Sequence, residues 1–222
     1  MGDIIVVRDL VKRFNDRVEV LDGLAFSIEA GDFVAVYGKS GCGKTTLLNI
    51  LGGLDRPTAG SVSIDGEEIA DMSEDDLAHL RLNKIGFVFQ DYNLIQDITV
   101  RENLMLPLRF SKQKSSSHID RLLSEFGIDH VAGECAKKIS GGEAQRTAIA
   151  RAMVNEPRIL IADEPTGNLD EENAESVIDM FGVARADLGA TIVLATHDSE
   201  IASHATTKMH LRNGGIEQSC HQ

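Results

Sequence analysis

The chain has no tryptophan, only 5% aromatic residues, and far fewer basic than acidic residues. With 22 Lys and Arg against 35 Asp and Glu, its net charge is −13. This charge disfavours binding to nucleic-acid phosphates and adsorption to an anionic lipid surface. The scarcity of aromatic side chains also disfavours a platform on which bases could stack. We therefore expect no nucleic-acid partner.

Cysteines and long apolar runs are also scarce. Cys42, Cys135 and Cys220 are too few and too scattered for a disulfide framework or a zinc site. No apolar run approaches the roughly 20 residues that a membrane-spanning helix needs, and the first residues lack the features of a secretory signal. We expect a chain in a reducing compartment that does not insert into a membrane. Any location at a membrane would then depend on another polypeptide.

A glycine-rich loop lies between two apolar segments, 33–37 and 47–51. The phosphate-binding pattern G-x-x-x-x-G-K-[ST] is matched by Gly38-Lys39-Ser40-Gly41-Cys42-Gly43-Lys44-Thr45-Thr46. Glycines let the backbone wrap around a polyphosphate, so that the N–H groups of the loop and of the next helix face the anion. We expect Lys44 to reach the β- and γ-phosphates of a nucleotide and the Thr45 hydroxyl to bind Mg²⁺.

A second apolar run, 159–162, leads into two adjacent carboxylates, Asp163 and Glu164. Ligands of open α/β sheets bind at the carboxyl ends of the strands, and successive residues of a strand point in different directions. Asp163 can therefore serve the Mg²⁺ while Glu164 faces the attacking water of a phosphoryl transfer. An Asp-Glu-Pro sequence alone would also fit a simple turn, but the glycine-rich loop favours the chemical interpretation.

Apolar strand-like runs alternate with helical patterns along the chain, which predicts an α/β fold with a mainly parallel sheet. The N-terminal strands at 4–7 and 26–28 and a hairpin at 61–64 predict an antiparallel β subdomain. From about residue 91 the strand-like alternation stops and helical segments follow. We predict a single domain, 1–222, with a P-loop NTPase core (1–90 and 156–222) and a helical insert subdomain (about 91–155).

Together these motifs resemble the nucleotide-binding subunit of an ABC transporter, over essentially the whole chain. Ile139-Ser140-Gly141-Gly142-Glu143 matches the family's LSGGQ signature, with Ile for Leu and Glu for Gln. Gln90, Asn168-Leu169-Asp170 and His197 fall where the family has its switch glutamine, the loop after the acidic strand and its switch histidine.

The resemblance implies that ATP and Mg²⁺ are the cofactors and that the chain is a Mg-dependent ATPase. The implied catalytic residues are Glu164, His197, Gln90 and Lys44. The implied Mg²⁺ residues are Thr45, Gln90 and Asp163. The nucleotide contacts that it implies, besides the glycine-rich loop, come from Phe14, Ser140, Gly141, Gly142, Glu143 and Asp170.

A serine N-cap followed by two glycines leaves helix N–H groups and a partial positive charge facing an anion. In the family this surface meets the γ-phosphate held by the opposite subunit. The resemblance therefore implies a head-to-tail homodimer that forms on ATP binding and separates after hydrolysis.

Three of these residues have simpler interpretations. A histidine after a strand is often only a satisfied polar residue, but His197 follows Thr196 where the nucleotide should lie. An aromatic near an N-terminal strand usually packs in the core, but Phe14 falls where the family stacks a ring on adenine. Cys42 replaces a common serine and, among N–H donors, is expected to be a reactive thiol, although a small neutral loop residue is the alternative.

Longer stretches narrow the resemblance to bacterial ATPases that pair with membrane subunits for lipoprotein release, macrolide efflux or antimicrobial-peptide resistance. These stretches are 52–60, 89–94, 101–108 and 167–170. They imply an integral membrane permease as partner, a peripheral location at the cytoplasmic face of the cell membrane, and ATP-driven export or mechanical signalling. Within the insert, Tyr92, Leu94, Ile95 and Ile98 either dock this partner or pack internally. A soluble nucleotide-gated regulator, or an ABC ATPase not engaged in transport, is the alternative function.

Overall fold

The computed structural model describes residues 2–14, 18–111 and 116–220. Within these residues the central sheet has the strand order β10-β9-β3-β8-β7-β6. Its strands are parallel except for β10, which pairs antiparallel with β9. The mainly parallel sheet predicted from the sequence is thus confirmed. The strand bounds are β3 (Phe33–Tyr37), β6 (Ile85–Phe89), β7 (Ile159–Asp163), β8 (Thr191–Thr196), β9 (Thr207–Arg212) and β10 (Gly215–Cys220).

A smaller antiparallel sheet, with the order β2-β1-β4-β5, confirms the predicted β subdomain. Its strands are β1 (Asp3–Phe14), β2 (Val18–Glu29), β4 (Ala59–Ile64) and β5 (Glu67–Glu68). The first two strands are longer than the sequence predicted. The β1–β2 ladder continues through register shifts, and Asp9 adopts a left-handed backbone conformation within the shift between Val7 and Leu10. Such bulges interrupt the alternation from which strands are recognised.

Two of the helices, α2 (Glu74–Lys84) and α3 (Val100–Leu108), begin at residues that form capping boxes. Ser73 and Thr99 accept hydrogen bonds from the N–H groups three residues later, and Asp76 and Glu102 reciprocate in capping boxes. The helices are α1 (Lys44–Leu51), α2 (Glu74–Lys84), α3 (Val100–Leu108), α4 (Ser116–Glu125), α5 (Gly141–Met153), α6 (Glu171–Leu188) and α7 (Ser199–Ser203), with short 3₁₀ turns η1 (Asp129–Val131) and η2 (Ala136–Lys138).

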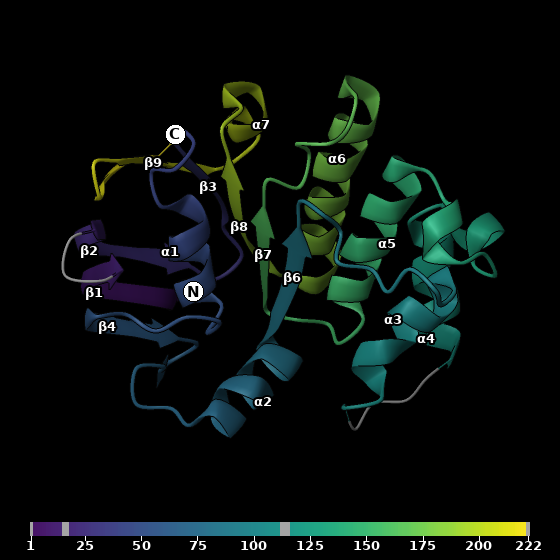
Figure 1. The fold of residues 1–222 in the computed structure, drawn as a ribbon, viewed down its shortest axis with the longest axis horizontal. Helices are drawn as coiled ribbons and strands as arrows, with labels where there is room; N and C mark the ends of the chain where they lie inside the picture. Colours follow the sequence, from purple (N-terminus) through teal and green to yellow (C-terminus); the bar gives the residue numbers. More distant parts are fainter. Residues whose placement is uncertain (1, 15–17, 112–115, 221–222) are drawn as a thin grey trace.

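The central sheet is buried on both faces. Phe33 and Ala35 belong to the cluster formed with α3, α4, α5 and α6, whereas Val34 and Val36 belong to the cluster formed with α1 and the antiparallel sheet. Figure 1 shows these two groups of elements on opposite sides of the central strands. Strands that are covered on both faces have continuous apolar sequences, and the central strands of this sheet have such sequences. The insert helices share the first cluster with the sheet, and the predicted subdomain boundary at residue 91 stays a prediction.

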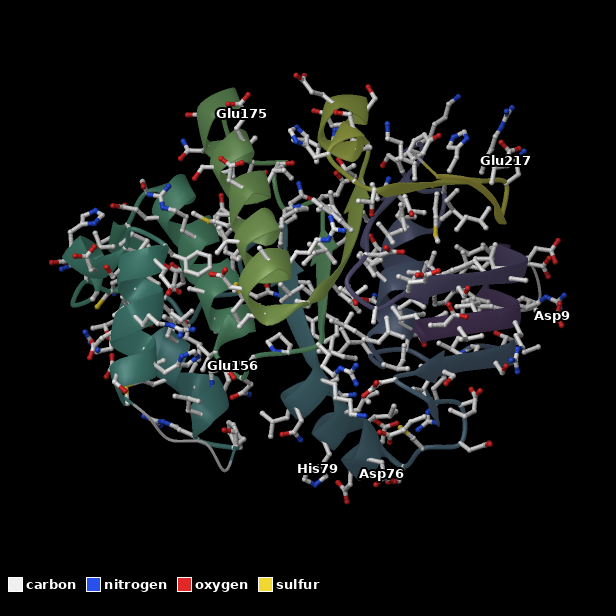
Figure 2. All side chains as sticks on the ribbon, turned by 180° about the vertical axis from the view of Figure 1, so that it is seen from behind. Asp9, Asp76, His79, Glu156, Glu175 and Glu217 are labelled. Carbon is white, nitrogen blue, oxygen red and sulfur yellow. The ribbon has the colours of Figure 1, made fainter. Side chains whose placement is uncertain are left out.

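The excess acidic side chains are spread over the outside of the molecule. Figure 2 shows Asp9, Asp76, Glu175 and Glu217 at its periphery, and they come from β1, α2, α6 and β10. All four are exposed. In the described ranges, none of the helices combines the length and the apolar character required to traverse a bilayer.

Candidate active site

The glycine-rich loop connects the end of β3 to the start of α1. Gly41 and Gly43 have φ angles of 77° and 107°, which side-chain-bearing residues rarely adopt. A Cβ on Gly38 would lie 2.4 Å from the carbonyl oxygen of Leu211 in β9, so no side chain fits there. The glycines are therefore required both by the backbone turn and by the close approach of β9.

A pocket of about 600 Å³ opens at this loop. It brings together residues from β2, the loop, α1 and the ends of β6, β7 and β8. The carboxyl ends of parallel strands meet at one sheet edge, so residues far apart in the chain converge there. The lining residues are Val20, Ser40, Gly41, Gly43, Lys44, Thr45, Thr46, Gln90, Glu164 and His197.

Lys44 lies inside this pocket with only 6% of its side chain exposed. Its Nζ donates a hydrogen bond of 3.0 Å to the carbonyl oxygen of Gly38 and lies 3.4 Å from Oε1 of Glu164. The ammonium group thus lies between the loop and the acidic residue. A phosphate bound in the pocket would compete with Glu164 for this cation.

Asp163 ends β7 beside the first turn of α1. Burial raises the pKa of Asp163 and the negative charge of Glu164 adds to this, while a hydrogen bond from Thr45 and the charge of Lys44 act in the opposite direction. Its Oδ1 is buried without a hydrogen-bond partner. Buried carboxylates of this kind are paired or coordinate a metal. A carboxylate and a hydroxyl in contact are oxygen ligands that fit Mg²⁺.

Among the residues that the structure describes, no group of three or more His, Cys, Asp or Glu is arranged to hold a metal ion. Asp163 and Thr45 alone would leave most of a Mg²⁺ shell to other ligands. Magnesium commonly binds one or two protein oxygens and takes the remaining ligands from water and substrate phosphates. The donor set therefore fits a nucleotide-bound Mg²⁺ better than a permanent metal centre.

Glu164 is held in a left-handed conformation, with φ 46°, directly before Pro165. Its Oε2 accepts hydrogen bonds from the backbone N–H of His197 at 3.2 Å, and the His197 Nδ1 lies 2.8 Å from the same oxygen. Its own N–H donates to the carbonyl oxygen of Ala195 in β8. The carboxylate is thereby fixed toward the pocket by two neighbouring strand ends. Strain of this kind is concentrated at functional sites.

Gln90 directly follows β6 and lines the pocket. A Cβ on Gly167 would lie 3.0 Å from its Nε2, so the loop after Glu164 packs closely on this side chain. The Asn168 Nδ2 also donates to the Gln90 carbonyl oxygen at 3.1 Å. The segments after β6 and after β7 are thus fastened to each other.

The signature residues lie outside this pocket. Ser140 and Gly141 are exposed, and Ser140 caps α5 in a capping box with Glu143. Hydrogen bonds from the Ser140 hydroxyl (2.7 Å) and backbone N–H (2.8 Å) lower the pKa of Glu143, and His130, 2.9 Å away, contributes less. The glutamate that replaces the family's glutamine therefore secures the helix start.

Asp170 caps α6 and accepts hydrogen bonds from the backbone N–H and Nδ2 of Asn173, at 3.0 and 2.7 Å. These bonds lower the pKa of Asp170. The Asn173 Oδ1 lies 3.4 Å from Nη1 of Arg146 in α5. A Cβ on Gly142 would lie only 2.4 Å from the same oxygen. Asp170 therefore does not line the pocket. It holds Asn173, and Asn173 in turn contacts Arg146 of α5.

Three further predicted nucleotide residues lie elsewhere. Phe14 is 44% exposed at the end of β1, has the Lys12 ammonium 5.0 Å from its ring centre, and is not among the lining residues. Lys39 and Cys42 line a separate hollow with β9 residues. Val20, which the sequence analysis missed, lines the pocket instead. Val20 is one of several residues of strand β2, and nothing in the sequence predicts that it, and not a neighbouring residue, lines the pocket.

Comparisons with known proteins agree with these motifs. The family profile described as "ABC transporter" matches residues 21–167. The macrolide export ATP-binding/permease protein MacB of Syntrophobacter fumaroxidans is 43% identical over 97% of this chain, and that of Bdellovibrio bacteriovorus is 42% identical over 98%. The chain spans only 31% and 33% of the length of these two relatives.

A solved structure is also similar: the dimeric, post-hydrolysis state of the ATP-binding cassette MJ0796 bound to ADP and Pi. It has a TM-score of 0.90 and 34% identity, and the match covers 97% of this chain and 98% of that one.

Proposed function

The chain belongs to the ABC transporter family, and from this membership we propose that it is the ATP-hydrolysing, nucleotide-binding part of a membrane ABC complex. One observation carries the proposal. Glu164 contacts both Lys44 and His197 in a pocket that is also lined by Thr45, the hydrogen-bond partner of Asp163. This arrangement offers cationic, metal-binding and water-orienting groups to a single phosphoryl group.

The proposed roles follow from these contacts. The loop N–H groups and Lys44 bind the phosphates, and Asp163 and Thr45 hold Mg²⁺, which when bound offsets the charge that develops during transfer. Glu164 orients the attacking water, and His197 holds Glu164 in place through the 2.8 Å contact. Gln90 contributes from the end of β6. Phe14 remains a proposed adenine contact that the lining of the pocket does not itself support.

We also propose that two copies assemble head to tail around ATP. Ser140 and Gly141 are exposed, and none of the signature residues lines the chain's own pocket, so an anion they bind would have to come from another copy. The similar cassette MJ0796 is a dimer bound to ADP and Pi. By analogy, Ser140, Gly141, Gly142 and Glu143 would face the γ-phosphate bound by the partner copy.

The proposed partner is an integral membrane permease, and the proposed location is peripheral, at the cytoplasmic face of the cell membrane. Support comes from the MacB relatives, whose names combine an ATP-binding part with a permease. Of the docking candidates, Leu94 is buried, whereas Ile95 is 49% exposed and its backbone is fixed by Asn103. Ile95 is therefore the preferred docking residue. Export or mechanical signalling would then be powered by ATP-driven dimerisation and hydrolysis.

The test is a comparison of the wild type with Glu164→Gln, and with Glu175→Gln as control. Glu175 is an exposed acid of α6, so its amide variant carries the same change in charge outside the pocket. We expect the wild type and the control to hydrolyse Mg-ATP. Glu164→Gln should bind ATP, form a stable dimer in size-exclusion chromatography with light scattering, and hardly turn over. A fully active Glu164→Gln protein would contradict the proposed role of this carboxylate.

A further inference from the structure

A single arginine joins the end of the signature helix α5 to the loop that follows Gln90. Arg151 donates from Nη1 to the Asn93 carbonyl oxygen at 2.5 Å and from Nη2 to the Tyr92 carbonyl oxygen at 2.9 Å. Burial lowers the pKa of Arg151, and no carboxylate of the described chain offsets this. A half-buried guanidinium is thus used to hold two successive backbone carbonyls.

The backbone that Arg151 holds is strained. Tyr92 and Asn93 have φ angles of 61° and 49°, and neither is glycine. Two successive residues in the left-handed region persist only where their surroundings impose it. The rigid fork of a guanidinium matches two adjacent carbonyls in a way that the single ammonium of a lysine cannot. The geometry of this loop therefore depends on Arg151.

Tyr92 also contacts the opposite end of the same helix. Its hydroxyl lies 3.2 Å from the position that a Cβ on Gly141 would occupy, and its ring packs against the cluster of Leu94, Ala136, Ala144 and Ala148. Ten residues of helix, or about 15 Å, separate Gly141 from Arg151. The loop is thus attached to α5 both beside the Ser140 cap and at the last turn.

The other end of this segment lies in the nucleotide pocket, because Gln90 lines it and is fastened to Asn168. We propose that Arg151 is a positioning residue for ATP hydrolysis. It makes residues 91–93 and α5 move as one unit, so that the place of Gln90 in the chain's own pocket determines where Ser140 is presented to a second copy. Figure 1 shows α5 running alongside β6, the strand that ends just before Gln90. This inference rests on the proposed function.

The first experiment compares the steady-state kinetics of the wild type, Arg151→Ala and Arg151→Lys. Arg101→Ala is the matched control, because Arg101 is an arginine of the insert that pairs at the surface with Asp120. We expect the Arg151 variants to keep the KM for ATP within about twofold, since they leave the pocket lining intact. Their kcat should fall at least about tenfold, with Lys restoring only a minor part, whereas the control should match the wild type.

The second experiment measures hydrogen–deuterium exchange in the Glu164→Gln background. Adding Mg-ATP should protect the glycine-rich loop and the first turn of α5 together. With Arg151→Ala added, protection should remain at the loop and be lost at α5. If Arg151→Ala does not fold, Arg151→Lys serves as the test variant for both experiments.

A folded Arg151 variant with wild-type kcat and undiminished protection of α5 would overturn the inference while leaving the proposed function intact. A wild-type chain without ATPase activity would instead contradict the proposed function. The exchange comparison needs nucleotide binding and ATP-dependent dimerisation but no hydrolysis, so it would still decide whether Arg151 couples the loop to α5 in a chain that dimerises without turning over.

Discussion

Replacing Gly142 by alanine would place a methyl carbon 2.4 Å from the Oδ1 of Asn173 and 3.4 Å from the Nη1 of Arg146. The Asn173 side chain cannot easily yield, because Asp170 and Arg146 hold its two polar atoms. We therefore expect the first turn of α5 to shift, or the Arg146–Asn173 contact to break. Either change alters the direction of the N–H groups that follow the Ser140 cap.

The stability and the activity of this variant should respond very differently. Loss of one hydrogen bond costs about 0.5–1.5 kcal/mol, and replacing glycine by alanine in a helix recovers about 0.5–1 kcal/mol. The free energy of unfolding should then change by less than about 1 kcal/mol, or about 2–4 °C in Tm for a domain of this size. Misaligning donors that stabilise a transition state costs on the order of 10² in rate.

The control is Gly182→Ala in α6, where an added Cβ would meet nothing within 4 Å. It should raise stability by about 0.5–1 kcal/mol and leave ATPase activity unchanged. The assays are urea denaturation, Mg-ATPase rate, and ATP-dependent dimerisation in the Glu164→Gln background. Adding Asn173→Ala to Gly142→Ala should restore part of the rate if the contact with Oδ1 is the cause. A folded Gly142→Ala protein with the wild-type rate would refute this reasoning.

Three further predictions concern other residues. Lys44→Ala should abolish the rise in Tm that Mg-ATP gives the wild type, which corresponds to about 2.7 kcal/mol at a hundredfold excess over Kd; an unchanged rise would exclude Lys44 as a phosphate ligand. Partial burial raises the pKa of Asp65, but Lys84 and Arg158 outweigh it and hold this pKa below its usual value. Its stabilisation is therefore complete above the unfolded-state pKa of about 3.9 and is lost as pH falls through the folded-state pKa. Asp65→Asn should cost about 0.5–1 kcal/mol in urea denaturation at pH 7, and this difference should close in acid; a difference independent of pH would count against the ion pair. Alkylation of Cys42, a half-buried free thiol of the glycine-rich loop, should block ATP binding, and bound nucleotide should slow the reaction; alkylated protein that binds ATP normally would rule this out.

Elements specified by neighbouring residues could be predicted from the sequence. The capping pairs Ser73–Asp76 and Thr99–Glu102 lie within four residues of each other, and they mark the observed starts of α2 and α3. The apolar run that ends at Asp163 is strand β7. Helix ends and buried strands rest on hydrogen bonds and periodicities of short range, so the chain itself reveals them.

The set of side chains that share the pocket was only partly predictable. Val20 lines the pocket although no sequence pattern predicted it. Phe14 was expected to contact the nucleotide, but it is not among the lining residues. These placements depend on how β1 and β2 pair and where the antiparallel sheet packs against the glycine-rich loop. Contacts of that kind are set by tertiary packing and leave no local pattern.

By itself the sequence determined the chemistry available to this protein: a loop that can surround phosphates, a strand that delivers two carboxylates, and a capped helix that can face an anion. The tertiary structure decided which of these groups meet. The strand order β3-β8-β7-β6 brings Glu164 within 3.4 Å of Lys44, and the guanidinium of Arg151 secures a left-handed loop to α5. Such contacts join residues tens of positions apart, and only the packed sheet and helices bring them within reach of one another.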